Sequence, residues 1–324
     1  MDKQEMLSIL DKFAGKRIAV VGDVALDSFL YGVIDRINPE MPSAPLLKID
    51  KEEFALGCAA NVALNLSKLG AKTKLFGVIG NDNFGRKFVD ECLKNNVDFI
   101  PFFDGSTILK QRIKEKHHKG YVARADFGEF DLTAINKEME DTILKRIFES
   151  DFNAIILSDY NKRIFKGNLA QRIIEESRKK GLAIFVDPKP NNMLAFKRCN
   201  VLKHNEREAR SMVGLENAHK DIEEIIKKIK EMLECECVII TRGEKGMTGY
   251  NSNFHHITTK AKEVEDVTGA GDTVMAVIAL AMVSGADLEK AAHIGNYAGG
   301  IVVEKSGTAY ATVEEIKKRI NDDK

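Results

Sequence analysis

The chain lacks an excess of charge, a long apolar run and a cysteine framework. Lys plus Arg and Asp plus Glu number 49 each among 324 residues, which argues against the basic surface of a nucleic-acid-binding protein. The longest apolar run, 274–283, is too short to cross a bilayer. Residues 1–17 are charged and amphipathic without a signal-peptide core, so we expect a cytoplasmic protein with no membrane partner.

The five cysteines are scattered and odd in number, as expected of a cytoplasmic protein. Cys235 and Cys237 lack the two-residue spacer of a zinc knuckle. The sequence therefore gives no indication of a cysteine-bound zinc ion.

Apolar segments rich in β-branched residues alternate with segments of helical periodicity. The strand-like segments are 17–23, 73–80, 153–159, 182–188 and 237–243, and the helix-like ones are 59–70, 85–96, 167–181 and 218–234. This alternation predicts an α/β fold in which helices cover a mostly parallel sheet. No Pro- or Ser-rich linker interrupts it, so we expect a single domain over 1–324.

Two segments, 31–57 and 104–130, break this alternation. Charged and apolar residues alternate in them, as in strands of a sheet with one face in water. We expect them to form one small β-element that folds over the main body as a lid.

A glycine-rich turn precedes the apolar helix near the C-terminus. The backbone amides of Gly269, Ala270 and Gly271 would favour an anion at the start of that helix. Asp272 beside such an anion would be useful as a base that takes a proton from an attacking hydroxyl. The alternative is that Asp272 only stabilises the first helical turn, by about 0.3–1 kcal/mol. Val274 stands where a dinucleotide-binding fingerprint needs its third glycine, which disfavours a nicotinamide-dependent oxidoreductase.

Five patterns, including the glycine-rich turn, occur together in the chain. They are GCAANVALNLSKLG (57–70), GVIGNDNFGRKFVDECLKNNVD (77–98), HNEREA (204–209), TRGEKG (241–246) and DVTGAGDT (266–273). In content and order these motifs resemble those of the ribokinase-like carbohydrate kinases, and the resemblance covers nearly the whole chain. It implies a ribokinase-like three-layer sandwich with a small β-sheet lid, and an enzyme that transfers phosphate from ATP to a sugar.

The resemblance also implies a role for individual residues. Asp272 would be the general base, and Gly269, Ala270 and Gly271 would form the anion hole. Asn205 and Glu208 would organise Mg²⁺ and the ATP phosphates, largely through water. The residues that would border the nucleotide are Thr241, Gly243 and Gly246, and those that would hold the sugar are Asp27, Gly57, Asn61 and Asp159. The lid often serves as a dimer surface in the family, so a homodimer is expected, and a monovalent cation such as K⁺ beside the anion hole is left open.

Shorter patterns narrow the resemblance to the kinase part of the bacterial heptose-phosphate kinases. They are VVGDVALDSFLYG (20–32), RINPEMPSAPL (36–46), LSDYNK (157–162), VDPK (186–189) and VVEKSGT (302–308). This implies phosphorylation of the anomeric hydroxyl of D-glycero-D-manno-heptose 7-phosphate. The chain has no H-x-G-H nucleotidyltransferase segment, so we expect a stand-alone kinase.

A substrate that already carries a phosphate requires fixed cations. The candidates are Lys110, Arg112, Arg124 and Lys189, although each could be an ordinary solvated charge. Cys58 stands where the family usually has a second glycine, which puts the backbone approach to the sugar in doubt. Two alternatives stay open: another ribokinase-family enzyme (ribokinase, fructokinase or phosphofructokinase-like) and a non-catalytic sugar-sensing module.

Overall fold

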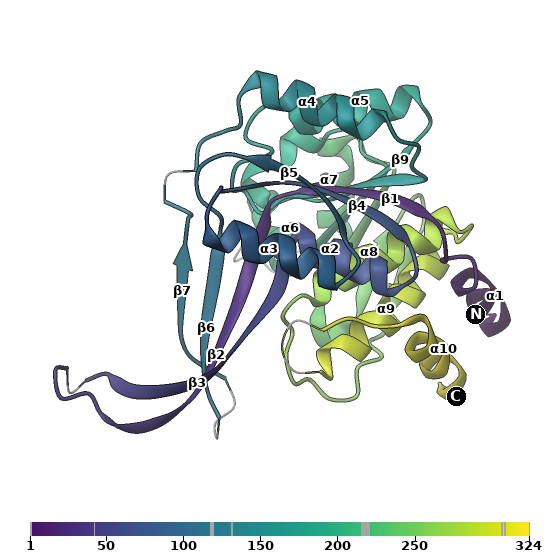
Figure 1. The fold of residues 1–324 in the computed structure, drawn as a ribbon. Coiled ribbons are helices and arrows are strands. Elements are labelled where there is room, and N and C mark those ends of the chain that lie inside the picture. The colour runs from purple at the N-terminus through teal and green to yellow at the C-terminus, as the bar shows by residue number, and fades with distance from the viewer. Residues whose placement is uncertain are drawn as a thin grey trace.

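Two β-sheets organise the chain, a large one inside the body and a small one that projects from it (Figure 1). The computed structural model describes residues 2–41, 43–116, 120–130, 132–214, 221–305, 307 and 309–323. Residues 42 and 117–119 of the predicted lid, and 218–220 of a predicted helix, lie outside the described residues.

The large sheet has nine strands in the order β13-β12-β11-β10-β9-β8-β1-β4-β5. Neighbours pair in parallel from β11 to β5, whereas β12 and β13 are antiparallel. The strands are β1 (Arg17–Gly22), β4 (Lys72–Ile79), β5 (Asp98–Phe103), β8 (Ala154–Ser158), β9 (Ala183–Asp187), β10 (Val201–Asn205), β11 (Cys237–Thr241), β12 (Met247–Tyr250) and β13 (Phe254–Ile257). All five predicted strands are confirmed.

Both faces of the large sheet are buried under helices. In β1, Ile18 and Val20 join one apolar cluster, and Ala19 and Val21 join the other, because successive side chains of a strand point to opposite faces. The first cluster includes residues of α1 (Lys3–Leu10), α2 (Ala59–Lys68), α3 (Asn83–Lys94), α8 (Ala270–Val283), α9 (Leu288–Val303) and α10 (Val313–Asp322). The second includes residues of α4 (Lys137–Phe148), α5 (Leu169–Lys179), α6 (Glu206–Met212), α7 (Ile222–Leu233) and the 3₁₀ helix η1 (Pro190–Phe196). The predicted three-layer α/β architecture is therefore confirmed.

Several elements were not predicted, among them β5 and β10. β10 carries Lys203 and His204, both buried, so its sequence does not read as an apolar run. β5 contains Pro101, which cannot donate to a ladder, and β5 is an edge strand, where proline is tolerated.

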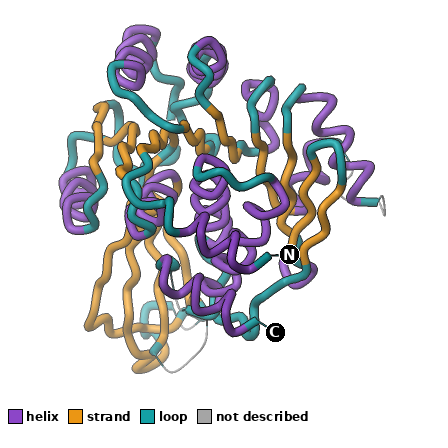
Figure 2. Tube along the Cα trace, turned by 90° about the vertical axis from the view of Figure 1, so that its right-hand side faces the viewer, coloured by secondary structure: helices purple, strands orange, loops and turns teal. Residues whose placement is uncertain are grey.

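The small sheet has the strand order β3-β2-β6-β7 and forms the lid. Its strands are β2 (Val24–Ile37), β3 (Pro45–Cys58), β6 (Leu109–Glu115) and β7 (Tyr121–Phe127). The expected separate β-element is confirmed, but its first strand begins at Val24 rather than at residue 31, because β2 follows β1 with only Asp23 between them. In Figure 2 the lid strands extend away from the helical body.

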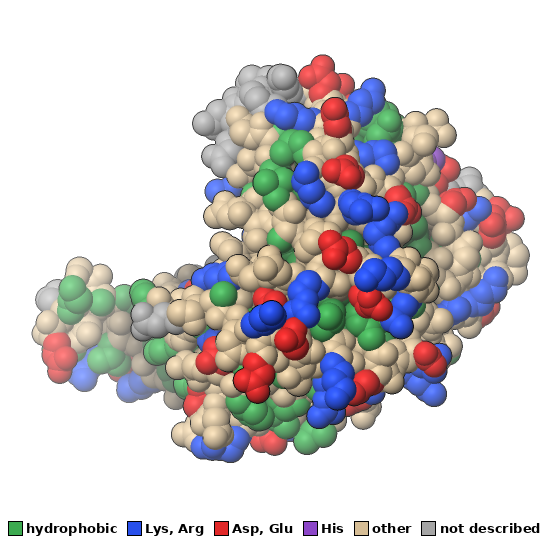
Figure 3. All heavy atoms as spheres, turned by 90° about the horizontal axis from the view of Figure 1, so that it is seen from above, with side chains coloured by type: hydrophobic (Ala, Val, Ile, Leu, Met, Phe, Trp, Pro, Cys, Tyr) green, Lys and Arg blue, Asp and Glu red, His purple; other side chains and the backbone are tan. Residues whose placement is uncertain are grey.

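The surface carries both signs of charge in alternation. Viewed from above, Lys and Arg side chains are interspersed with Asp and Glu over the helical face (Figure 3). Among the helices that the structure describes, none has the length and apolar character needed to span a membrane.

Candidate active site

The carboxyl ends of the parallel strands, the base of the lid and the start of α8 meet at one place. Gly269 precedes α8 with φ 79° and ψ −1°, a left-handed conformation that glycine adopts without steric cost. This turn places Asp272 in the first turn of α8 with its side chain buried. The amide of Ala270 donates to the carbonyl of Val267 (3.3 Å), so one of the three amides of the predicted anion hole has a partner within the turn.

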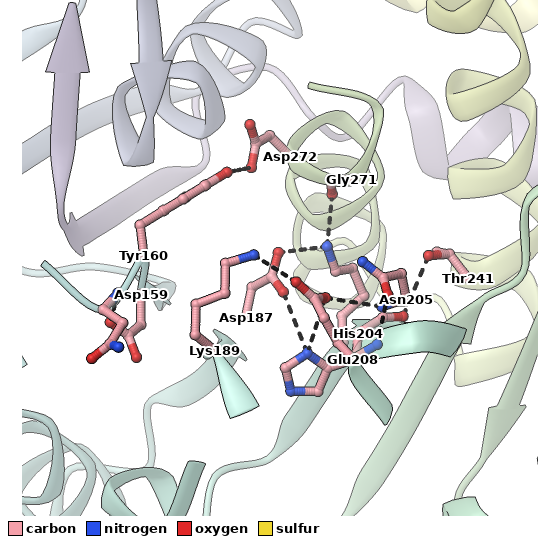
Figure 4. Close-up of polar contacts among 12 residues, drawn as sticks. Asp159, Tyr160, Asp187, Lys189, His204, Asn205, Glu208, Thr241, Gly271 and Asp272 are labelled. Atoms are coloured by element: carbon pink, nitrogen blue, oxygen red, sulfur yellow. Dashed lines mark hydrogen bonds and ion pairs between the residues drawn. The ribbon is translucent and has the colours of Figure 1, made fainter. Parts of the chain in front are cut away.

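Asp272 is held by two neutral donors. The side-chain amide of Asn61, from α2, donates to Oδ2 (2.8 Å), and the hydroxyl of Tyr160, after β8, donates to Oδ1 (2.9 Å; Figure 4). Burial raises the pKa of Asp272 to about 6, although the Asn61 amide and the charge of Lys203 act in the opposite direction. A carboxylate with a pKa near neutrality is suited to accept a proton from a reacting group.

Asp272 lines a pocket of about 210 Å³ at the base of the lid. The structure brings most of the predicted sugar-site residues to this pocket, together with four residues that were not predicted to contact the sugar. Its lining residues are Asp27, Gly57, Cys58, Asn61, Lys110, Arg112, Arg124, Tyr160, Thr268, Gly269 and Asp272.

The three cations of the pocket differ in how they are neutralised. Arg112 forms an ion pair with Asp27 (Nη1–Oδ1 2.7 Å), and Arg124 contacts Asp126 through two bonds of 2.7 Å. Lys110 has no carboxylate within ion-pair distance among the described residues. Its ammonium donates to the sulfur of Cys58 (3.0 Å) and lies 5.2 Å from the centre of the Tyr160 ring.

Cys58 occupies a backbone conformation that usually requires glycine. Its φ of 57° and ψ of −133° lie outside the regions open to side chains with a Cβ, which costs about 1–3 kcal/mol. The backbone therefore follows the path expected for the family's glycine, and the thiol projects into the pocket. Burial raises the pKa of this thiol to about 12, so it is neutral at pH 7.

A second polar cluster lies at the ends of β9 and β10. Ligand atoms of Asp187, His204 and Glu208 all lie within 4.8 Å of one another. Lys189 contacts Glu208 (Nζ–Oε1 2.5 Å), and Lys203 contacts Asp187 and the carbonyl of Gly271 (Figure 4).

The electrostatics of this cluster keep Glu208 ionised. Burial alone would raise the pKa of Glu208, but hydrogen bonds from His204 and Lys189 hold it well below its usual range. Asn205 and Glu208 also cap α6 reciprocally, since each side chain accepts from the other's backbone amide (2.8 and 3.3 Å). The predicted pair thus has a local structural role as well as a position at the cluster.

The predicted nucleotide residues lie beside this cluster, at the end of β11. Thr241 Oγ1 donates to the carbonyl of His204 (3.3 Å). Gly243 is the first residue of the 3₁₀ turn η2 (Gly243–Lys245) and Gly246 follows the turn, with φ of 57° and 77°. A Cβ on Gly246 would lie 1.9 Å from the carbonyl oxygen of Ile257, so the turn itself requires glycine there.

Two predicted substrate residues are not among those that line the 210 Å³ pocket. Asp159 is buried and accepts hydrogen bonds from the Asn161 amide (2.7 Å) and the Asn192 side chain (3.2 Å). Lys189 contacts Glu208 in the second cluster and does not lie with the cations of the lid.

Tyr160, Lys203 and His204 were missed by the sequence prediction. The only signal for them was their position next to residues already singled out, in LSDYNK and in the segment before Asn205.

The family model described as "pfkB family carbohydrate kinase" matches residues 16–315 of the chain. The chain belongs to this family. It is therefore a carbohydrate kinase, a phosphotransferase that acts on a sugar hydroxyl, as the sequence predicted.

Curated relatives include "Bifunctional protein HldE" of Pasteurella multocida, 34% identical over 316 residues, and that of Haemophilus influenzae strain Rd, 35% identical over 317 residues. Each match covers 96% of this chain and 64% of the relative, so the chain spans less than two thirds of these proteins.

Solved structures of other kinases have the same fold. Phosphofructokinase-2 from Escherichia coli in complex with potassium has a TM-score of 0.78 at 18% identity, covering 95% of this chain and 98% of that one. Arabidopsis thaliana ribokinase complexed with ribose and ATP has a TM-score of 0.71 at 16% identity, covering 94% and 99%. The predicted ribokinase-like fold is confirmed.

Proposed function

We propose that this chain is an ATP-dependent kinase of a phosphorylated sugar, D-glycero-D-manno-heptose 7-phosphate, and that it phosphorylates the anomeric hydroxyl to give the 1,7-bisphosphate. The observation that carries the proposal is the pocket that combines Asp272, a buried carboxylate, with Lys110, a buried ammonium that has no carboxylate of the described chain within ion-pair distance, although the charges of Asp27 and Glu129 act on it. A buried cation needs an anionic partner, and a substrate phosphate supplies one. The relatives named HldE and the heptose-kinase motifs favour this sugar.

The reaction follows from the placement of Asp272. Its carboxylate takes the proton of the anomeric hydroxyl while that oxygen forms a bond to the γ-phosphorus of ATP. The bond between this phosphorus and the bridging oxygen of ADP breaks, so the products are ADP and the bisphosphate. Gly269, Ala270 and Gly271 lie at the start of α8, where the helix dipole favours the charge of the transferring group.

The second cluster fits a divalent cation. Asp187 and Glu208 offer the carboxylate oxygens that Mg²⁺ prefers, and Asn205 fixes the helix turn that carries Glu208. Bound there, Mg²⁺ would neutralise charge on the ATP phosphates. Thr241, Gly243 and Gly246 would border the nucleotide at the end of β11.

A matched pair of substrates tests the proposal. ADP release is measured with ATP and either heptose 7-phosphate or the same heptose without its phosphate, and ³¹P NMR identifies the phosphorylated position. We expect kcat/KM to be about 10–100-fold higher for the phosphorylated sugar, because one charge-assisted contact is lost without the phosphate. Equal or better activity on the free heptose would refute this substrate. Replacing KCl with choline chloride in the same assay tests for a monovalent cation.

We also infer that two copies pair through their lids. The projecting hairpin exposes Ile34, Ile37, Met41 and Ile49, which are 43, 69, 58 and 42% exposed. Light scattering should give a dimer for the wild type and a monomer for Ile37→Glu. Leu93→Glu, at an equally exposed position on α3, is the matched control and should stay dimeric. A monomeric wild type would contradict the inference.

A further inference from the structure

The segment after β8 is clamped by one buried carboxylate. Asp23 Oδ2 accepts from the backbone amides of Tyr160 (3.1 Å) and Lys162 (2.9 Å), and Oδ1 accepts from those of Arg163 (3.0 Å) and Ile164 (3.2 Å). Asp23 itself is 3% exposed. Four backbone hydrogen bonds to one buried carboxylate fix the path of this segment, and hence the direction in which Tyr160 points.

The Tyr160 side chain touches both halves of the site. Its hydroxyl donates to Asp272 (2.9 Å), and the Nζ atoms of Lys110 and Lys189 lie 5.2 and 5.0 Å from the centre of its ring. Lys110 lines the sugar pocket, whereas Lys189 contacts Glu208 in the second cluster. Both ammonium distances are within the range of cation–π attraction.

We propose that Tyr160 is a positioning residue of the kinase: its hydroxyl fixes the carboxylate of Asp272, and its ring holds the ammonium of Lys110 in the sugar pocket and that of Lys189 in the second cluster. This inference rests on the proposed function and names a residue for it. Asn61 and Tyr160 each occupy one lone pair of one Asp272 oxygen, so a lone pair on each oxygen stays available to a sugar hydroxyl. A carboxylate held at both oxygens loses no rotational freedom when the sugar binds.

The groups around Asp272 determine how removal of the Tyr160 hydroxyl should change the pKa of Asp272. Burial raises the pKa of Asp272 and the nearby charge of Asp187 adds to this, whereas Asn61, Lys203 and the Tyr160 hydroxyl lower it. Lys189 and the neutral thiol of Cys58 are further titratable neighbours, and the other charged groups of the same pocket are Asp27, Lys110, Arg112 and Arg124. Burial, followed by the charge of Asp272, keeps the pKa of Tyr160 well above its usual value, so the hydroxyl stays a donor. Its loss should therefore raise the pKa of Asp272.

Tyr160→Phe removes the hydroxyl and keeps the ring. We expect the acid limb of the kcat/KM–pH profile to move up by about one unit and kcat to fall about tenfold, with little change in either KM. Tyr297→Phe, on α9, removes a tyrosine–aspartate hydrogen bond to Asp323, which follows α10; it is the matched control and should leave the limb in place. A purely structural role would lower activity without moving the limb.

Tyr160→Leu tests the ring. We expect the KM values for sugar phosphate and for ATP to rise together, about fivefold or more each, because both ammonium groups lose their aromatic contact. Circular dichroism shows whether this variant folds, and Tyr160→Phe carries the test if it does not. Unchanged KM values in a folded Tyr160→Leu protein would overturn the role of the ring.

A measurement without substrate separates this inference from the proposed function. In protein labelled with ¹³C at aspartate carboxyls, Asp272→Asn assigns the Asp272 resonance, which is titrated in wild type and in Tyr160→Phe. A higher pKa in Tyr160→Phe supports the hydroxyl contact even if the wild type phosphorylates no sugar phosphate, which would refute the proposed function alone. The same titration midpoint in both proteins would overturn the positioning role.

Discussion

Asp272→Asn should remove activity and make the folded chain more stable at neutral pH. The pKa of Asp272 is about 6 in the folded chain, against about 3.9 for an unfolded aspartate. The folded state thus binds a proton more tightly than the unfolded state does. The contribution of Asp272 to the free energy of unfolding is then highest below pH 4, falls as pH rises toward 6, and is lower by roughly 3 kcal/mol above pH 7.

Asparagine carries no charge and avoids this loss. It also replaces one carboxylate oxygen by an amide nitrogen, which cannot accept the hydrogen bond from Asn61 or Tyr160 and costs about 1 kcal/mol. We therefore expect the variant to be more stable than wild type by about 2 kcal/mol at pH 8 and slightly less stable at pH 4. As the proposed base is gone, turnover should fall by about 10²–10⁴ while ATP still binds.

Denaturant unfolding of both proteins at several pH values between 4 and 8 measures the difference directly. Asp82→Asn is the control, and its change in stability with pH should have the opposite sign. Burial raises the pKa of Asp82, but backbone amides of Thr107 and Gly85 outweigh it and hold the pKa below its usual value, so this variant should lose stability at pH 7 and lose less as pH falls. The prediction is refuted if the difference in unfolding free energy between Asp272→Asn and wild type is the same at pH 4 and pH 7, or if the variant keeps near-normal turnover.

Three further outcomes are expected. Cys58→Gly should be more stable than Cys58→Ala by about 1 kcal/mol and should therefore unfold at a higher temperature, because only glycine relieves the strained backbone. At Arg146, an exposed position of helix α4, the alanine variant should instead be more stable than the glycine variant. Lys110→Met should lower kcat/KM for the phosphorylated heptose about 10–100-fold and leave the free heptose unaffected, whereas Lys48→Met, on the exposed lid, should change neither; equal losses on both sugars would contradict a phosphate contact. Glu208→Gln should raise the Mg²⁺ concentration for half-maximal rate about 10–100-fold, and an unchanged Mg²⁺ titration would remove Glu208 from the metal site.

The sequence predicted the layers of the fold and the turn that holds Asp272, because both depend on local patterns. Alternating apolar strands and periodic helices require only short-range information, and the α8 turn needs glycine at Gly269 for its left-handed backbone. Asn61 could be predicted as well, since a motif of the family marks it. These elements were set by residues near one another in the chain.

The charge pairing of the site could not be predicted, because it depends on register. In the parallel pair β2·β6, Asp27 lies opposite Lys110, yet its carboxylate binds Arg112 two residues further along. No local pattern shows which of the two cations remains unpaired. Tyr160 was missed for a similar reason, as the path of its segment is set by Asp23, which precedes it by more than a hundred residues.

Asp23 is also the one residue between β1 of the body sheet and β2 of the lid. Its amide donates to Ser158, its carbonyl accepts from Ala59, and its carboxylate receives the four amides of the 160–164 segment. Hydrogen bonds thus tie the root of the lid to the elements beside it. We expect any bending of the lid to occur further out, where the pairing of β2 with β3 is irregular at Tyr31/Gly32 and Ile34/Arg36. Access to the sugar would then be controlled by the outer half of the lid, while the residues around the proposed base keep their places.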